Sequence, residues 1–225
     1  MPIPASRPDR RSFLASLGAL SGFALFSKGG RVEAVPASLS QISSPWDLSW
    51  LDTLKGKHKQ VFDFGHANIS DESHLGVVRN YLNAHEEVSG LEYPRVNTVV
   101  GIAYRAYPLN ASDALWEKYP IGETWKIKDP RTNAWAKRNI YTDPDQTDPK
   151  GPYTVQALVA RGTAFWQCNN ALGFVVETLA KASGRPVETV RAELLQGMMP
   201  GVHLVPAHTM LIGLAQEHGF TYESM

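Results

Sequence analysis

The sequence predicts an open, mostly parallel α/β sheet of about five strands flanked by helices. Short apolar segments alternate with longer segments of helical period, which is the pattern of strand–helix units in a parallel sheet. The run Asn-Thr-Val-Val-Gly-Ile-Ala-Tyr at 97–104 is apolar on both sides, as in a strand covered by helices on both faces. No internal repeat is visible, and the length suits one domain with one core.

The N-terminus predicts an export signal. Arg10-Arg11-Ser12-Phe13-Leu14 resembles the twin-arginine motif, and the apolar stretch 13–26 is shorter than the ~20 residues that a spanning helix needs. Small residues precede a cleavage site after Ala34, with Ala37 as an alternative and an uncleaved anchor as the competing interpretation. We therefore expect a signal peptide at 1–34, a periplasmic protein and no stable membrane insertion after cleavage. This route often exports proteins that are folded around a cofactor, but the sequence identifies none.

Composition argues against nucleic acid as a partner. Removal of residues 1–34 leaves 17 basic and 20 acidic residues of the 22 of each in the whole chain. A weakly acidic domain lacks the basic surface that binds nucleic acid. The chain also has no glycine-rich phosphate loop and no zinc-type spacing of Cys and His.

The elements follow in order. Residues 35–58 read as a tether and an N-terminal segment that packs on the body, and the α/β domain spans 59–225. Strands are predicted at 61–64, 97–104, 163–167, 202–205 and, as a final edge strand, 220–223. Helices are predicted by apolar period and by glycine stops at 70–87, 112–119, 155–161, 172–183, 187–197 and 207–218.

A Pro- and Trp-rich insertion at 120–152 interrupts this pattern. A loop of this length in a compact domain is usually functional or disordered. Four aromatic residues in and beside it either line a pocket for a planar ligand or anchor the loop itself: Trp116, Trp125, Trp135 and Tyr141.

Cys168 is the only cysteine, so it forms no disulfide within the chain. It ends a predicted strand, where open parallel sheets place their ligands, and a helix begins just after it. A helix N-terminus and the amides of Asn169 and Asn170 would favour a thiolate or a persulfide. The alternative is a small buried apolar side chain.

Three histidines are candidate binding residues. His66 follows the first strand and can share an edge of the sheet with Cys168, with Asp63 nearby to orient it. His203 and His208 flank the end of the fourth strand. Their spacing matches no recognised ligand pattern, so we predict no metal site.

Three segments carry a resemblance to a known family. They are Gly-Thr-Ala-Phe-Trp-Gln-Cys-Asn-Asn-Ala-Leu at 162–172, Pro-Gly-Val-His-Leu-Val-Pro-Ala-His at 200–208 and Gln-Glu-His-Gly-Phe-Thr-Tyr at 216–222. Together they resemble the DsrE/DsrF-like family, most closely its exported members, over residues 59–222. The resemblance implies a flavodoxin-like sheet, assembly as a homotrimer or hexamer, and a sulfur-relay cysteine that carries a persulfide at the position of Cys168.

Three functions follow as hypotheses. The first is a periplasmic sulfur-handling protein in which Cys168 accepts or presents sulfane sulfur, as a carrier or weak sulfurtransferase. Its partner would be a small sulfur compound or a sulfur-carrier protein. The second is a non-catalytic module that binds a small ligand or cofactor between Cys168 and the insertion. The third is a structural assembly protein with a buried cysteine.

The export signal gives a direct prediction. Replacing Arg10 and Arg11 together by lysine should leave the protein in the cytoplasm, because the paired guanidinium groups form the address. Cell fractionation followed by immunoblotting measures this. Export of the double variant at the wild-type level would contradict the signal assignment.

Overall fold

The computed structural model describes residues 46–67, 69, 73–142 and 150–225. The predicted signal peptide at 1–34, most of the tether and residues 143–149 of the insertion lie outside these residues. In the described part of the chain, no helix has the length and apolar character needed to cross a membrane.

The sheet is parallel throughout, with five strands in the order β4-β3-β2-β1-β5. The strands are β1 His58–Phe64, β2 Val96–Ile102, β3 Ala164–Cys168, β4 Val202–Val205 and β5 Thr221–Ser224. The predicted flavodoxin-like architecture, an open parallel sheet between helices, is therefore confirmed, and β5 is an edge strand as predicted.

Helices cover both faces of the sheet. They are α1 Trp50–Thr53, α2 Leu75–Ser89, α3 Asp113–Lys118, α4 Ile121–Thr124, α5 Val155–Ala160, α6 Asn169–Ser183, α7 Val187–Gln196 and α8 His208–Glu217, with 3-10 turns η1 Tyr107–Asn110 and η2 Ile140–Thr142. Two long helices end at glycines in the left-handed region, Gly90 with φ 60° and Gly184 with φ 67°. Helix α6 begins three residues earlier than the apolar pattern predicted, because Cys168 caps it.

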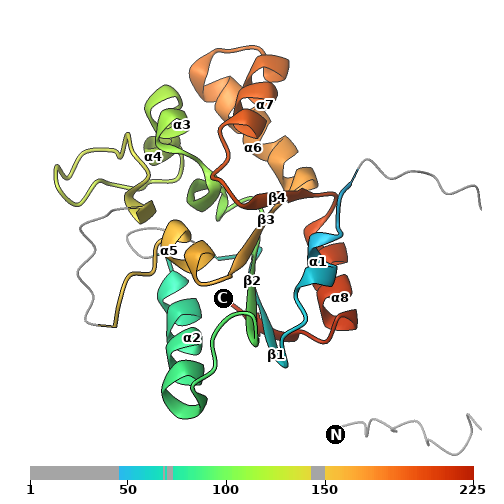
Figure 1. Cartoon of the computed structure of the whole chain (residues 1–225). Helices are drawn as coiled ribbons and strands as arrows, with labels where there is room; N and C mark the ends of the chain where they lie inside the picture. The colour runs from blue at the N-terminus through green and yellow to red at the C-terminus, as the bar shows by residue number, and fades with distance from the viewer. Residues whose placement is uncertain (1–45, 68, 70–72, 143–149) are drawn as a thin grey trace, which may run out of the picture. The chain divides into compact units, whose positions relative to one another are not determined.

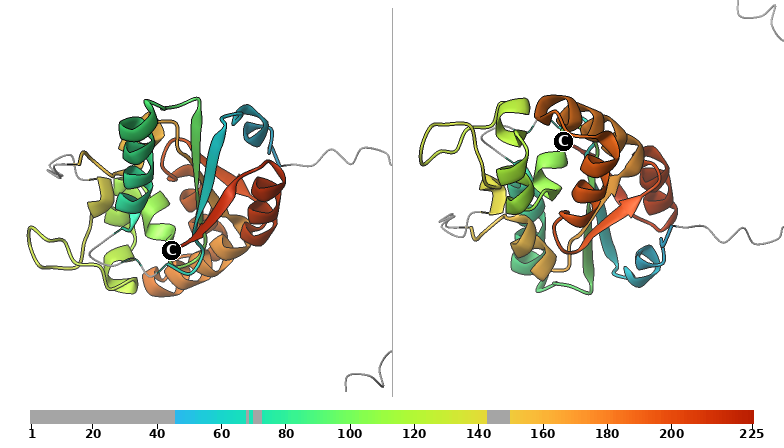
Figure 2. Two further views of the ribbon diagram at one scale, coloured as in Figure 1. Left: turned by 90° about the horizontal axis from the view of Figure 1, so that it is seen from below. Right: turned by 90° about the horizontal axis from the view of Figure 1, so that it is seen from above.

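The strand order explains which helices lie on which face. From β1 to β4 the chain moves steadily in one direction across the sheet, and then it returns to place β5 beside β1. Because crossovers between parallel strands are right-handed, the connections from β1 to β4 lie on one face of the sheet and the connection from β4 to β5 lies on the other. Figure 1 accordingly shows α8, with α1, on one side of the sheet and α2 and α5 on the other, and Figure 2 shows the same layers from below and above.

Alternate strand residues supply two cores. Phe62 and Phe165 belong to the larger core, under α2 and α5–α7, whereas Val61 and Trp166 belong to the smaller one, under α1 and α8. This alternation is the period of two expected of a strand that is covered on both faces.

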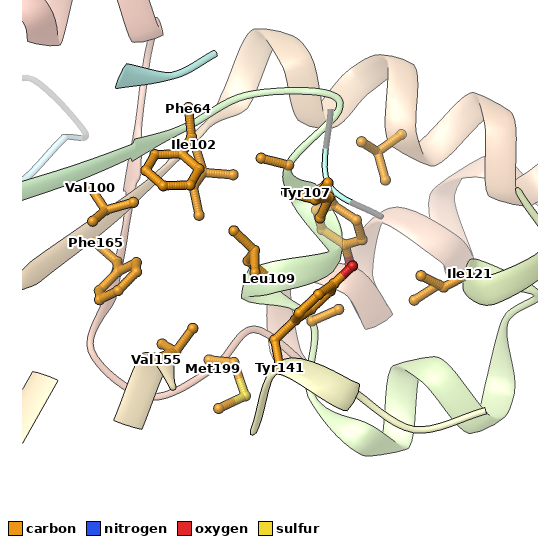
Figure 3. Packing of buried hydrophobic residues seen from close by; sticks show 14 of the residues in the cluster. Phe64, Val100, Ile102, Tyr107, Leu109, Ile121, Tyr141, Val155, Phe165 and Met199 are labelled. Carbon is orange, nitrogen blue, oxygen red and sulfur yellow. The ribbon is translucent and has the colours of Figure 1, made fainter. Parts of the chain in front are cut away.

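The insertion is held by a few buried groups. Ile121, Ile127 and Tyr141 join the larger core (Figure 3), where the Tyr141 ring lies edge-on to Trp116 with centroids 6.3 Å apart. The buried amide of Asn139 donates to the carbonyl of Ala111 at 2.7 Å, which fixes the end of the loop against η1. The aromatic side chains Trp116 and Tyr141 thus serve as anchors of the loop.

A glycine in β2 makes room for the smaller core. A Cβ atom at Gly101 would lie 2.4 Å from the Trp166 ring and 3.0 Å from the ring of His208. Gly101 pairs in register with Asp63 on one side and Trp166 on the other. The missing side chain therefore leaves a gap in this row, and the ring of His208 lies against it.

The different surroundings of two glycines predict opposite effects of their substitution by alanine. Gly101→Ala should lower the free energy of unfolding by about 1–3 kcal/mol, because the methyl group overpacks the Trp166 ring. Gly213→Ala in α8 should raise it by roughly 0.5–1 kcal/mol, because its Cβ meets no atom within 4 Å and alanine favours a helix. Urea denaturation measures both free energies of unfolding. An unchanged free energy of unfolding in Gly101→Ala would contradict the packing argument.

Candidate functional site

Cys168 is the last residue of β3 and the N-cap of α6. Its Sγ atom accepts two backbone N–H groups, from Ala171 at 3.4 Å and from His208 at 3.3 Å. The residue is only 4% exposed. An N-cap acceptor satisfies one of the free N–H groups of a helix start, so the thiol has a structural role in beginning α6.

A cavity of about 670 Å³ lies beside Cys168, at the carboxyl edge of the sheet. Residues at or just beyond the carboxyl ends of four strands form part of its wall. They are His66 after β1, Tyr104 and Arg105 after β2, Cys168 at the end of β3, and Ala207 after β4. One face of α6 completes it, with Asn170, Phe174, Glu177 and Thr178. The site therefore lies where open parallel sheets place their ligands.

A buried hydrogen-bond chain supports the wall behind the sulfur. The Trp166 indole donates to His208 Nδ1 at 3.0 Å, and His208 Nε2 lies 2.7 Å from Asp63 Oδ1. Because an indole N–H only donates, Nδ1 must carry the lone pair, and Nε2 then donates to the carboxylate. Both ring nitrogens of His208 are engaged, so its ring is fixed in place and its backbone N–H is directed at Cys168.

Asp63 is held as a carboxylate by three donors. Besides His208, it accepts from the backbone N–H of Gly65 at 2.7 Å and, through Oδ2, from the Tyr222 hydroxyl at 2.7 Å. Burial opposes ionisation, but these hydrogen bonds prevail and lower the pKa of Asp63 to about 2. Tyr222 belongs to the edge strand β5, so the network ties the edge of the sheet to its centre.

Four of the six predicted site residues line the cavity, namely Cys168, Asn170, His66 and His208. The other two lie elsewhere. Asn169 accepts from the Arg191 guanidinium at 2.6 Å and so faces α7. His203 stacks on Trp50, with ring centroids 4.4 Å apart, and burial lowers its pKa.

The three candidate histidines do not come together in one site. His208 is bound to Trp166 and Asp63, while His203 lies under α1. The sequence predicted that Asp63 orients His66, but in the structure Asp63 bonds the ring of His208. Within the described residues, no group of three or more His, Cys, Asp or Glu side chains is placed to hold a metal ion.

The sequence did not single out the aromatic and charged residues of the cavity. Tyr104 and Phe174 form a T-shaped pair with centroids 6.4 Å apart, and Arg105 lies beside them in the wall. The helical spacing of Asn170, Phe174 and Thr178 was the available signal, since residues four apart share a face. No described residue of the insertion at 120–152 lines this cavity, although Trp125 packs against Tyr104 at 6.0 Å.

Comparison with known proteins assigns no function. No family model matches the chain, and no curated protein matches it. Among solved structures, it is similar to a protein of unknown function from Methanobacterium thermoautotrophicum, at 16% identity and a TM-score of 0.36. That match covers 75% of this chain and 99% of the other.

The lowered pKa of Asp63 predicts acid-sensitive stability. A carboxyl group whose pKa is about 2 when folded and 3.8 when unfolded stabilises the fold fully above pH 3.8, by about 2 kcal/mol, and loses this as the pH falls to 2. Asp63→Asn keeps the shape and an acceptor for His208 but cannot titrate. The difference in free energy of unfolding between wild type and variant should therefore shrink from pH 5 to pH 2, as followed by denaturation at each pH. A constant difference would contradict the assignment.

Proposed function

We propose that this protein is a periplasmic sulfur carrier in which Cys168 accepts sulfane sulfur as a persulfide and presents it to an acceptor. The observation that carries the proposal is the position of Cys168, which is a wall residue of a cavity and whose sulfur accepts two backbone N–H groups. Such donors stabilise negative charge on sulfur, which both the attacking thiolate and the resulting persulfide carry.

The transfer needs no oxidant. The Cys168 sulfur attacks the terminal sulfur of a donor, a new S–S bond forms, and the old bond from that sulfur to the rest of the donor breaks. The leaving group departs with the electron pair, and the thiol proton passes to the persulfide or to solvent. A weak sulfurtransferase repeats this step in reverse on an acceptor, which is a small sulfur compound or a sulfur-carrier protein.

Compartment and assembly belong to the same proposal. The Arg10-Arg11 motif supports export to the periplasm. The edge strand β5, whose four residues are all exposed, supports assembly as a homotrimer or hexamer, because an open edge favours pairing or cover.

A second candidate is a non-catalytic module that binds a small ligand. The cavity volume favours it, and so does the engagement of both His208 ring nitrogens, which leaves that histidine unsuited to proton transfer. This candidate differs from the carrier in requiring no chemistry at Cys168.

One labelling experiment separates the two. Incubation of the folded protein with inorganic polysulfide should add one sulfur atom to Cys168, seen by intact mass and removed by a thiol reductant. Iodoacetamide should likewise label Cys168 before unfolding, because Cys168 is a wall residue of the cavity and the 4% of it that is exposed faces a space that the reagent can enter.

Cys168→Ser is the matched control. It should acquire no sulfur, and it should remain folded, because a serine hydroxyl can accept the same N–H groups and is a preferred N-cap. A native protein that resists both reagents until it is denatured would reject the carrier and leave the binding module.

A further inference from the structure

We propose that the cavity beside Cys168 receives a small organic anion with a flat aromatic body, and that this anion carries the sulfane sulfur. This inference rests on the proposed carrier function, because it assumes that sulfur is transferred to Cys168. It adds the class of donor: an aromatic thiosulfonate or a similar organic persulfide, as opposed to an inorganic sulfur anion.

The size of the cavity is the first argument. Its volume of about 670 Å³ lies within the range of pockets that hold small organic ligands, roughly 300–1,000 Å³. An inorganic anion of a few atoms would leave most of this space unfilled. A donor that fills the cavity therefore has an organic body.

The aromatic wall is the second argument. Phe174 is 64% exposed, which is unusual for a phenylalanine in a helix, and it meets Tyr104 edge to face. The Tyr104 hydroxyl bonds the Thr178 hydroxyl at 3.3 Å, and Trp125 packs against the Tyr104 ring. Tyr104 is thus held in position, and the open face of Phe174 offers a stacking surface for a flat ring.

The charges of the wall are the third argument. Arg105 and His66 are exposed residues of the wall, and neither side chain has a hydrogen bond or ion pair with another described residue, so both can meet an anion. Glu177 bears the opposite charge, but it lies nine residues beyond Cys168, about 13 Å along α6. An anion at the Cys168 end therefore lies apart from that carboxylate.

The chemistry balances for such a donor. With benzenethiosulfonate, the Cys168 thiol takes the terminal sulfur, the bond from this sulfur to the sulfonyl group breaks, and benzenesulfinate leaves with the electron pair. The products are the Cys168 persulfide and a sulfinate anion, and the thiol proton passes to the persulfide or to solvent. No electron acceptor is required, because the sulfur moves without change in the total oxidation state.

The first test compares donors. Sulfur transfer to the native protein is timed by mass with benzenethiosulfonate and with methanethiosulfonate, and each rate is divided by that of the same donor with free cysteine. The normalised rate should favour the aromatic donor by about three- to tenfold, the range of one aromatic contact. Phe174→Ala should abolish this preference, whereas Val88→Ala, at an exposed helix position 83% accessible, should retain it.

The second test measures binding without transfer. Benzenesulfonate has no transferable sulfur, and its affinity for the wild type is measured by calorimetry. Arg105→Gln should weaken binding about two- to fivefold, the range of an exposed ion pair. Lys181→Gln, on the same helix as Phe174, is the matched loss of charge and should leave binding unchanged. Glu177→Gln should leave binding unchanged or tighten it.

The outcomes separate the two proposals. Sulfur uptake from polysulfide with no preference for the aromatic donor overturns the donor class and leaves the carrier intact. Binding of benzenesulfonate without uptake from any donor overturns the carrier and, with it, the sulfur-bearing ligand. Tighter binding of phenyltrimethylammonium than of benzenesulfonate overturns the anionic character of the ligand.

Discussion

The ring of His208, fixed between the Trp166 indole and the Asp63 carboxylate, is the contact on which the site depends. It joins β1, β3 and the start of α8, and through Tyr222 it reaches the edge strand β5. It fits only because Gly101 leaves a gap in the row of side chains between Asp63 and Trp166. The same residue places its backbone N–H on Cys168, so the environment of the thiol is set from four of the five strands.

The sequence was sufficient for the elements whose burial is local. Short apolar runs between segments of helical period located all five strands, and the position of Cys168 at a strand end followed from them. It was insufficient where tertiary contacts decide the direction of a side chain. Asn169 turns toward Arg191 because α6 begins at Asn169 itself, and His203 is covered by Trp50 from a segment more than a hundred residues away. Asp63 within an apolar strand was the visible signal for the buried network, but its partner was not readable from spacing.

The described residues of the insertion support the wall of the cavity without lining the cavity themselves. They are ordered by buried anchors such as Ile127 and Asn139, and Trp125 then packs against Tyr104 in the cavity wall. A long loop can thus shape a ligand site that its described residues do not line, by fixing one aromatic ring of the wall. The aromatic residues of the insertion therefore have different roles. Tyr141 anchors the loop and Trp125 supports Tyr104, and no described aromatic residue of the insertion lines the cavity with Cys168.

The chemistry of the cap is the remaining argument about Cys168. If Cys168 were an apolar side chain of similar size, the N–H groups of Ala171 and His208 would be buried without an acceptor, which costs free energy. A purely structural cap would be better made by a hydroxyl or carboxylate, since sulfur is a weak acceptor and serine, threonine, aspartate and asparagine are the preferred N-caps. A thiol at this position gives up capping strength and gains nucleophilicity. In a protein that uses the sulfur, the nucleophilicity compensates for the weaker cap. In a scaffold protein nothing compensates for it, and we therefore favour sulfur chemistry over a scaffold role.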